Sequence, residues 1–224
     1  MASMQHPCTL EPCRHRSRAV ALSRHRRFST RRPTWRIQAD TRSRPTSRFD
    51  RTGDGSRLGY ISAATAMSIG EHDGRSVSYV DFADALAELS ENPAADLREL
   101  YGRIALTVLI NNVDDHWRNH GLLRGRTGWR LAPVFDLNPS RSRRVITSRP
   151  ISADDDPRRR DLRSLIAVAD AFGLSGAAAA GVVRGVGEHV ARWRDVAGEL
   201  QIDAGQIESM AGAFDEQQLE YALG

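Results

Sequence analysis

Apolar residues recur at helical spacing in two long stretches of the first half of the chain. Over residues 79–90 they stand three or four positions apart, which predicts an amphipathic helix. Residues 92–112 show a broader apolar face at the same spacing, with Asp96 near the expected helix start. That face consists of Leu97, Leu100, Tyr101, Ile104, Val108 and Leu109. Its breadth predicts a buried helix.

After residue 120 the pattern becomes typical of a β-hairpin. A strand around Leu122 is followed by residues 125–128, which begin and end with glycine, and by a second strand over Trp129–Phe135. The stretch from 137 to 160 is polar, and it predicts an exposed loop between this hairpin and whatever follows.

The last third of the chain returns to helical spacing. We expect one helix over Leu162–Ala171, a second that Ser175 caps, and shorter helices near 203–213 and 215–223. The second helix has an apolar face on Val182, Val183, Val186, Val190 and Trp193. The second half is therefore predicted to be mostly helical.

The first 47 residues show neither a helical nor a strand period. They contain eleven Arg against only Glu11 and Asp40, a net charge of +9, so the total of +4 leaves −5 on the remainder. All 32 basic residues of the chain are Arg, and Lys is absent. The Arg-, Ser- and Pro-rich composition predicts that residues 1–47 form a disordered tail.

Three interpretations of this tail are open. It could be a basic arm for nucleic acid, or an acid-poor transit peptide. It could also be a shifted reading frame or a misassigned start, because GC-rich coding sequence read out of frame yields such residues. We favour the third interpretation, because the composition of the chain changes abruptly at Arg48. We expect direct nucleic-acid binding to be the least important function.

Cysteine usage and hydropathy favour a cytoplasmic protein. The two cysteines, Cys8 and Cys13, lack a second ligand pair at zinc-finger spacing, and they do not form a disulfide framework. No apolar run reaches the ~18–20 residues that span a bilayer. We therefore expect no metal site at the cysteines and no membrane partner.

Polar groups gather immediately after the expected buried helix, in residues 111–119, which read NNVDDHWRN and are called the polar loop below. Asp114 and Asn119 have the D-x-x-x-x-N spacing of protein-kinase catalytic loops, and Asp136 follows 17 residues after Asn119. Because a hairpin returns the chain to the same edge, these three side chains are expected to converge. One carboxylate would take a proton from a hydroxyl, and the other carboxylate and the amide oxygen would hold Mg²⁺.

Each part of this pattern also has a simpler interpretation. The D-x-x-x-x-N spacing is weak by itself, and Asp115 could simply cap a turn. His116 and His120 are four residues apart, but they lack the glutamate of a zincin motif. We expect His116 to be a structural histidine that pins the loop by hydrogen bonds, and His120 to open the strand without a special role. Trp117 is expected to pack in the core.

The whole pattern is more specific than its parts. NNVDDHWRNHGLL at 111–123, followed by WRLAPVFDLNPS at 129–140, resembles the HipA family of bacterial serine/threonine kinases, the toxins of HipBA toxin–antitoxin modules. RFDR at Arg48–Arg51 resembles the segment that follows the hinge between the two lobes in that family. The matching positions of the main motif are Asn112, Asp114, Asp115, His116, Asn119, Leu131, Pro133 and Asp136, with Phe135 where the family has Tyr.

The resemblance implies a mainly α-helical, protein-kinase-like C-lobe of HipA type over residues 48–224, a helical bundle with a small β-hairpin. It makes Asp114 the catalytic base and makes Asn119 and Asp136 the Mg²⁺ ligands. The backbone of Arg48 and Phe49 would lie against the adenine of ATP, and His116 is assigned to the same nucleotide site. ATP and Mg²⁺ are thus the expected cofactors.

Two features of the family are not found in this sequence. We expect the N-lobe to be absent, because residues 1–47 contain nothing like a glycine-rich phosphate loop, and no Lys exists to grip the phosphates. Phosphorylation of a protein Ser or Thr is therefore expected to be weak or absent. The family's best-known substrate is glutamyl-tRNA synthetase, so an aminoacyl-tRNA synthetase is one expected substrate. The alternative is an inactive remnant that binds a HipB-like helix-turn-helix antitoxin.

Overall fold

The computed structural model describes residues 48–70, 74–141 and 149–224, so the predictions made for residues 1–47 lie outside the described residues. Helices dominate the described part, with one small sheet. The elements are β1 (Tyr60–Ser62), α1 (Ala63–Ala66), α2 (Tyr79–Leu89), α3 (Pro93–Leu109), β2 (Gly121–Arg124), β3 (Trp129–Leu131), α4 (Leu162–Ala167), η1 (Ala169–Phe172), α5 (Gly176–Ala191), α6 (Trp193–Glu199), α7 (Ala204–Ser209), η2 (Ala211–Ala213) and α8 (Glu216–Leu223).

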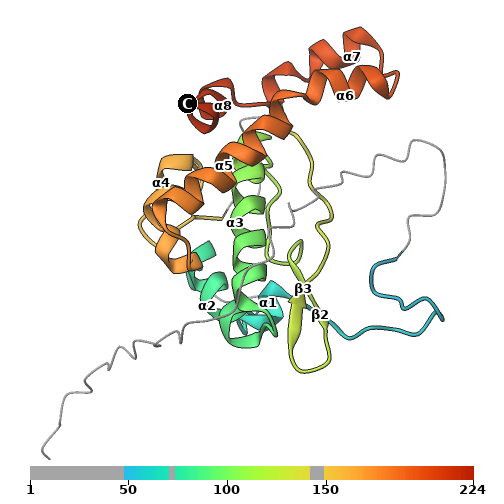
Figure 1. Ribbon diagram of the computed structural model, residues 1–224, viewed down its shortest axis with the longest axis vertical. Helices are drawn as coiled ribbons and strands as arrows, with labels where there is room; N and C mark the ends of the chain where they lie inside the picture. The colour runs from blue at the N-terminus through green and yellow to red at the C-terminus, as the bar shows by residue number, and fades with distance from the viewer. Residues whose placement is uncertain (1–47, 71–73, 142–148) are drawn as a thin grey trace, which may run out of the picture. The chain divides into compact units, whose positions relative to one another are not determined.

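Helix α3 is the centre of the fold. It packs against α2 on one side and is crossed by α5, while the small sheet lies beside it (Figure 1). The expected apolar face is buried along its whole length, and Leu100, Tyr101, Ile104 and Leu109 are fully inaccessible to solvent. The Tyr101 hydroxyl donates to the Leu165 carbonyl at 3.0 Å and so links α3 to α4. The predicted buried helix is confirmed.

The sheet has three antiparallel strands in the order β1-β2-β3. The predicted hairpin forms β2 and β3, with Leu122 opposite Leu131, and β1 adds a strand with Ile61 opposite Leu122. The second strand ends at Leu131, four residues earlier than expected. Pro133 explains this end, because proline cannot donate a ladder hydrogen bond.

The hairpin is held against α3 by buried charged groups. Asp96, in the first turn of α3, accepts hydrogen bonds from the Arg130 guanidinium at 3.1 Å and from the Leu131 backbone N–H at 3.3 Å. Further along α3, the buried Arg103 donates to the Ala132 carbonyl at 2.7 Å. The segment that carries Asp136 therefore leaves the sheet from a fixed point.

Two of the later helices differ from their expected bounds. The helix expected over Leu162–Ala171 is interrupted at Val168, where α4 ends and the 3₁₀ turn η1 follows. The helix capped by Ser175 ends at Ala191, so Trp193 begins α6 and its ring stacks on Phe214 with centroids 4.0 Å apart. The helix expected near 203–213 is divided into α7 and η2, and the helix expected near 215–223 forms α8. Ile151, within the stretch expected to be an exposed loop, is fully buried.

The hairpin turn gives the first testable prediction. A Cβ atom added at Gly128 would lie 2.8 Å from the Leu89 carbonyl oxygen and 3.0 Å from the Glu91 nitrogen, so backbone would have to move. We expect Gly128→Ala to lower the free energy of unfolding by about 1–3 kcal/mol in urea titrations. Gly181, exposed on α5 with open space around it, is the control. Gly181→Ala should stabilise by about 0.5–1 kcal/mol, and a neutral Gly128→Ala would contradict the close approach.

Candidate active site

The polar loop begins at a fixed backbone position at the end of α3. Asn111 has a positive φ of 47°, a conformation that Asn tolerates better than most residues. Its side-chain amide donates to the Ser140 carbonyl at 2.6 Å, and the Ser140 N–H donates to the Ile110 carbonyl at 3.3 Å. The start of the polar loop is thus joined to the segment that follows Asp136.

The predicted base and one predicted metal ligand lie together in the loop. The Asn119 side-chain Nδ2 donates to the Asp114 carbonyl oxygen at 3.3 Å, and the Asn119 backbone N–H donates to the His116 carbonyl at 2.8 Å. The Asp114 carboxylate is 49% exposed, so a hydroxyl from outside can approach it. The D-x-x-x-x-N spacing therefore closes a compact loop that leaves the Asp114 carboxylate accessible.

Asp115 points the other way, into the core, and is 1% exposed. Its Oδ2 accepts from the Tyr79 hydroxyl at 2.6 Å and from Arg160 Nη1 at 2.7 Å, while its Oδ1 lies 3.0 Å from His120 Nε2. The three partners come from α2, from the segment before α4 and from the residue before β2. Asp115 is therefore the centre of a buried polar network, and it does much more than cap a turn.

This network changes how its members ionise. Burial opposes ionisation of Asp115, but the hydrogen bond with His120 and the positive charge of Arg160 outweigh it, so the pKa of Asp115 lies below its ordinary value of 3.8. Burial, and then the Asp115 charge, raise the pKa of Tyr79 well above its ordinary value. Asp115 is therefore a carboxylate and Tyr79 a neutral donor at neutral pH.

The lowered pKa of Asp115 predicts a pH dependence of stability. Its contribution is complete above the unfolded-state pKa and is lost as the pH falls through the lower folded-state pKa, so the loss begins below about pH 4. We expect the free energy of unfolding of the wild type to fall in this range more steeply than that of Asp115→Asn, by up to about 1.4 kcal/mol per pH unit. Urea titrations from pH 7 to pH 3 measure both slopes, and equal slopes would contradict the assignment.

The two histidines have roles opposite to those expected. His120 is buried, bonds Asp115 and packs against Phe82, with ring centroids 5.8 Å apart. The side chain of His116 is 34% exposed, its Nε2 lies 4.0 Å from Asp114 Oδ1, and its shielded Nδ1 has no partner among the described residues. The expectation of a structural His116 and a passive His120 was wrong, because it is His120 that points into the core. Trp117 packs in the core as expected.

The predicted hinge segment lies beside the segment that carries Asp136. The ring of Phe49 stacks on Phe135, with centroids 5.6 Å apart and planes 25° from parallel, and the exposed Arg48 pairs with Asp50 at 2.6 Å. Asp136 is exposed, has a positive φ of 56°, and accepts from the Asn138 side chain at 3.0 Å. The meeting of Asp136 with Asp114 and Asn119 stays a prediction.

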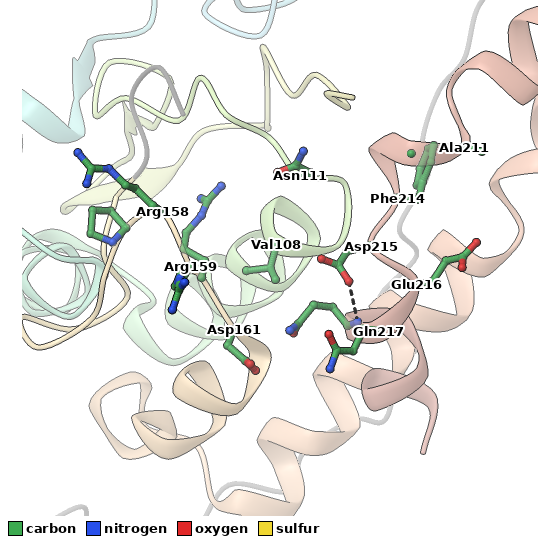
Figure 2. A pocket seen from close by; sticks show the side chains of 14 residues that line it. Val108, Asn111, Arg158, Arg159, Asp161, Ala211, Phe214, Asp215, Glu216 and Gln217 are labelled. Atoms are coloured by element: carbon green, nitrogen blue, oxygen red, sulfur yellow. Dashed lines mark hydrogen bonds between the residues drawn. The ribbon is translucent and has the colours of Figure 1, made fainter. Parts of the chain in front are cut away.

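One cleft borders the start of the polar loop. It has a volume of about 670 Å³ and contains Asn111 and Arg160 in its lining, but not Asp114, Asn119 or Asp136. Figure 2 shows Arg158 and Arg159 on one wall and Asp215, Glu216 and Gln217 on the other. The cleft therefore borders Asn111 and Arg160, which anchor the polar loop, and does not include its exposed carboxylate.

Two wider searches of the described residues gave negative results. No three His, Cys, Asp or Glu side chains in 48–70, 74–141 and 149–224 gather as a metal-binding group. Within the same described part, none of the helices combines the length and the apolar character required to cross a bilayer.

Comparison with known proteins identifies the family and a similar fold. A sequence model of the HipA-like C-terminal domain matches residues 19–194, so the match starts inside the segment predicted to be a tail, and the boundary at residue 48 stays a prediction. A chain from the complex of the Shewanella oneidensis MR-1 toxin–antitoxin proteins HipA and HipB with operator DNA has a similar fold. The TM-score is 0.58 at 19% identity, over 79% of this chain and 46% of that one.

This chain thus spans about half the length of that solved chain, and at 19% identity the likeness concerns the fold. No curated protein matches the chain. The family match covers most of the sequence and agrees with the mainly helical fold and its small antiparallel sheet. The chain belongs to the family of HipA-like C-terminal domains.

Proposed function

We propose that this chain is the C-lobe of a HipA-like serine/threonine kinase, which transfers the γ-phosphoryl group of ATP to a protein hydroxyl with the help of Mg²⁺. The closed polar loop carries the proposal. Asn119 donates its Nδ2 to the Asp114 carbonyl, so its other polar atom, the acceptor Oδ1, is the one that would bind a cation. The adjacent Asp114 carboxylate is half exposed to solvent.

Asp114 is the proposed base. A carboxylate at this position orients the attacking hydroxyl and accepts its proton as the bond to phosphorus forms. The chain holds Asp114 through its neighbours, since the buried Asp115 fixes the backbone on one side and the Asn119 amide binds its carbonyl. The base is therefore accessible at its side chain and constrained at its backbone.

Asn119 and Asp136 would hold Mg²⁺. Both offer hard oxygen atoms, which Mg²⁺ prefers, and the exposed Asp136 engages only one of its oxygens with Asn138. Bound Mg²⁺ would neutralise charge on the phosphate oxygens. A pair made of one amide and one carboxylate is also compatible with the lack of a three-residue acidic or histidine cluster among the described residues.

The nucleotide would lie along Arg48 and Phe49, next to His116. The Phe49 side chain is occupied by its stack on Phe135, so it is the backbone of this segment that would face the adenine. The shielded Nδ1 of His116 lacks a partner among the described residues, and a buried polar atom in that state favours a missing ligand or neighbour. These two observations support the nucleotide assignment.

We expect the activity of this chain to be low. It contains no Lys, and Arg presents a broad fork where a kinase uses a compact charge to grip the phosphates. Loss of such a contact to the transferring phosphoryl group costs several kcal/mol of transition-state stabilisation. An aminoacyl-tRNA synthetase is one protein substrate to try, and any protein Ser or Thr fits the proposed chemistry.

Metal binding tests the proposal directly. We expect Mn²⁺, added with ATP as a stand-in for Mg²⁺, to bind the full chain, and Asn119→Leu and Asp136→Asn each to weaken it by about tenfold or more. Free Mn²⁺ is counted by electron paramagnetic resonance. Asp154→Asn, an exposed change in the loop before α4, is the matched control and should leave binding intact. Equal binding by all four proteins would reject this site.

A second candidate function is a binding module for a HipB-like antitoxin. It is favoured by the similar solved chain, which belongs to a complex of HipA, HipB and operator DNA. A purely binding role needs no base, so Asp114→Asn should bind a HipB-like helix-turn-helix protein as tightly as the wild type does. Calorimetry of both proteins with that partner measures this, and a loss of affinity in the variant would argue against it.

A further inference from the structure

Arg160 reaches the polar loop from 45 residues away and touches it at two points. Its Nη2 donates to the Asn112 carbonyl oxygen at 2.5 Å, and its Nη1 donates to Asp115 Oδ2 at 2.7 Å. The side chain is only 7% exposed although the segment around it lies at the surface. The two acceptors lie two residues before and one residue after Asp114.

We propose that Arg160 is a positioning residue of the phosphotransfer site, whose single guanidinium holds the backbone of the polar loop on both sides of Asp114. The inference rests on the function proposed above and adds to it a residue that lies outside the polar loop and outside the motif residues that carry the resemblance to the HipA family. Arg160 need not touch the substrate, because it acts through Asn112 and Asp115.

The geometry of arginine makes this clamp stiff. The two Nη atoms belong to one planar group, so the distance between the Asn112 carbonyl and the Asp115 carboxylate is set by covalent geometry. Only Val113 and Asp114 lie between the two anchor points. Lysine carries its donors on a single nitrogen, so it lacks the rigid fork that fixes the spacing of the two anchors.

The clamp is itself fixed to the core. Asp115 is also held by the Tyr79 hydroxyl and by His120. The Arg160 guanidinium therefore connects the Asn112 carbonyl to a side chain that is fixed to α2 and to the residue before β2. Catalysis is sensitive to such placement, because misplacing a reacting group by about 1 Å can cost about 10²-fold in rate. A loop whose hydrogen bonds were all internal would not be held in a fixed position relative to α2 and β2.

A general loss of stability could resemble the loss of the clamp. A substitution at Arg103 distinguishes these two causes. Arg103 is also 7% exposed, and it also binds one carbonyl oxygen, that of Ala132 at 2.7 Å, and one carboxylate, that of Glu99 at 2.9 Å. Both contacts lie outside the polar loop. Arg103→Met therefore removes a buried, doubly bonded arginine without touching the neighbours of Asp114.

The experiment compares Arg160→Met, Arg160→Lys and Arg103→Met in the full chain, well below each melting temperature. Arg160→Met should lower kcat by about 10²-fold and change KM for ATP by less than about threefold, because the clamp orients the base and does not bind the nucleotide. Arg160→Lys should fall between Arg160→Met and the wild type, and Arg103→Met should leave the amide exchange of residues 112–119 at the wild-type level. Amide hydrogen exchange of residues 112–119 should rise by about tenfold in Arg160→Met alone.

Equal exchange of residues 112–119 in Arg160→Met and Arg103→Met would overturn the proposal and leave Arg160 a stabilising residue only. If Arg160→Met does not fold, Arg160→Lys gives the same comparison. If the wild type shows no phosphotransfer, the proposed kinase function fails on its own. In that case a rise in exchange confined to 112–119 still supports the clamp, and the lack of such a rise overturns it.

Discussion

Asp115→Ala is expected to lower the free energy of unfolding by about 3–5 kcal/mol, among the largest effects of any single substitution in this chain. The Asp115 carboxylate is 1% exposed and binds Tyr79, His120 and Arg160. Its removal leaves the Arg160 guanidinium buried without a counter-charge, and it takes the carboxylate from Tyr79 and His120, whose Oη and Nε2 atoms then have each other at 3.2 Å. A buried charge left unpaired in this way costs more than the intact network contributes. Urea titration at neutral pH measures the change.

An exposed charge on α2 supplies the control. Asp84 is exposed, and burial of its surroundings together with the charges of Asp81 and Glu88 raises its pKa, so its ionised form is mildly unfavourable. Asp84→Asn should therefore change stability by no more than about 0.5 kcal/mol. Adding Arg160→Met to Asp115→Ala should recover part of the loss, because the unpaired charge disappears. A cost below about 1 kcal/mol for Asp115→Ala would contradict the central role of this carboxylate.

The helices and the hairpin were predictable because their signals are local. The spacing along 92–112 placed α3, and its Leu100 and Ile104 are fully buried as the pattern required. Glycines at 125 and 128 bracketed the hairpin turn. Strand β1 was missed because three residues show no period, and it exists only through its pairing with β2. The break at Val168 was missed because the apolar spacing of α4 continues through η1.

The polar loop could be identified from the sequence, but the role of its buried residue Asp115 could not. The D-x-x-x-x-N spacing identified Asp114 and Asn119, and the structure joins them by a hydrogen bond. One signal for Asp115 was available, since residues 113 and 115 share one face of an extended segment and Val113 is apolar. The partners of Asp115 were beyond local reach. Arg160 lies 45 residues away in a polar run that resembles a plain exposed loop.

The second large prediction concerns the neighbouring aspartate. Asp114→Asn is expected to lower the phosphotransfer rate of the chain by about 10²–10⁴-fold, the usual contribution of a positioned base. Asparagine keeps the size of the side chain and cannot accept the proton of the attacking hydroxyl. Transfer of labelled γ-phosphate to a protein acceptor, measured as a rate at saturating ATP, gives the comparison. Asp154→Asn, equally exposed in the loop before α4, should retain the wild-type rate.

Substitution of the two adjacent aspartates should thus affect different properties, the rate for Asp114 and the stability for Asp115. Asp114 is 49% exposed, so Asp114→Asn should change the free energy of unfolding by no more than about 0.5 kcal/mol while the rate collapses. Asp115→Ala should lose stability first and activity as a consequence. If Asp114→Asn kept its rate, the base would have to be another group, and the polar loop would remain a structural feature of a binding module. If it lost stability as Asp115→Ala does, the division of the loop into an outer chemical face and an inner anchoring face would be wrong.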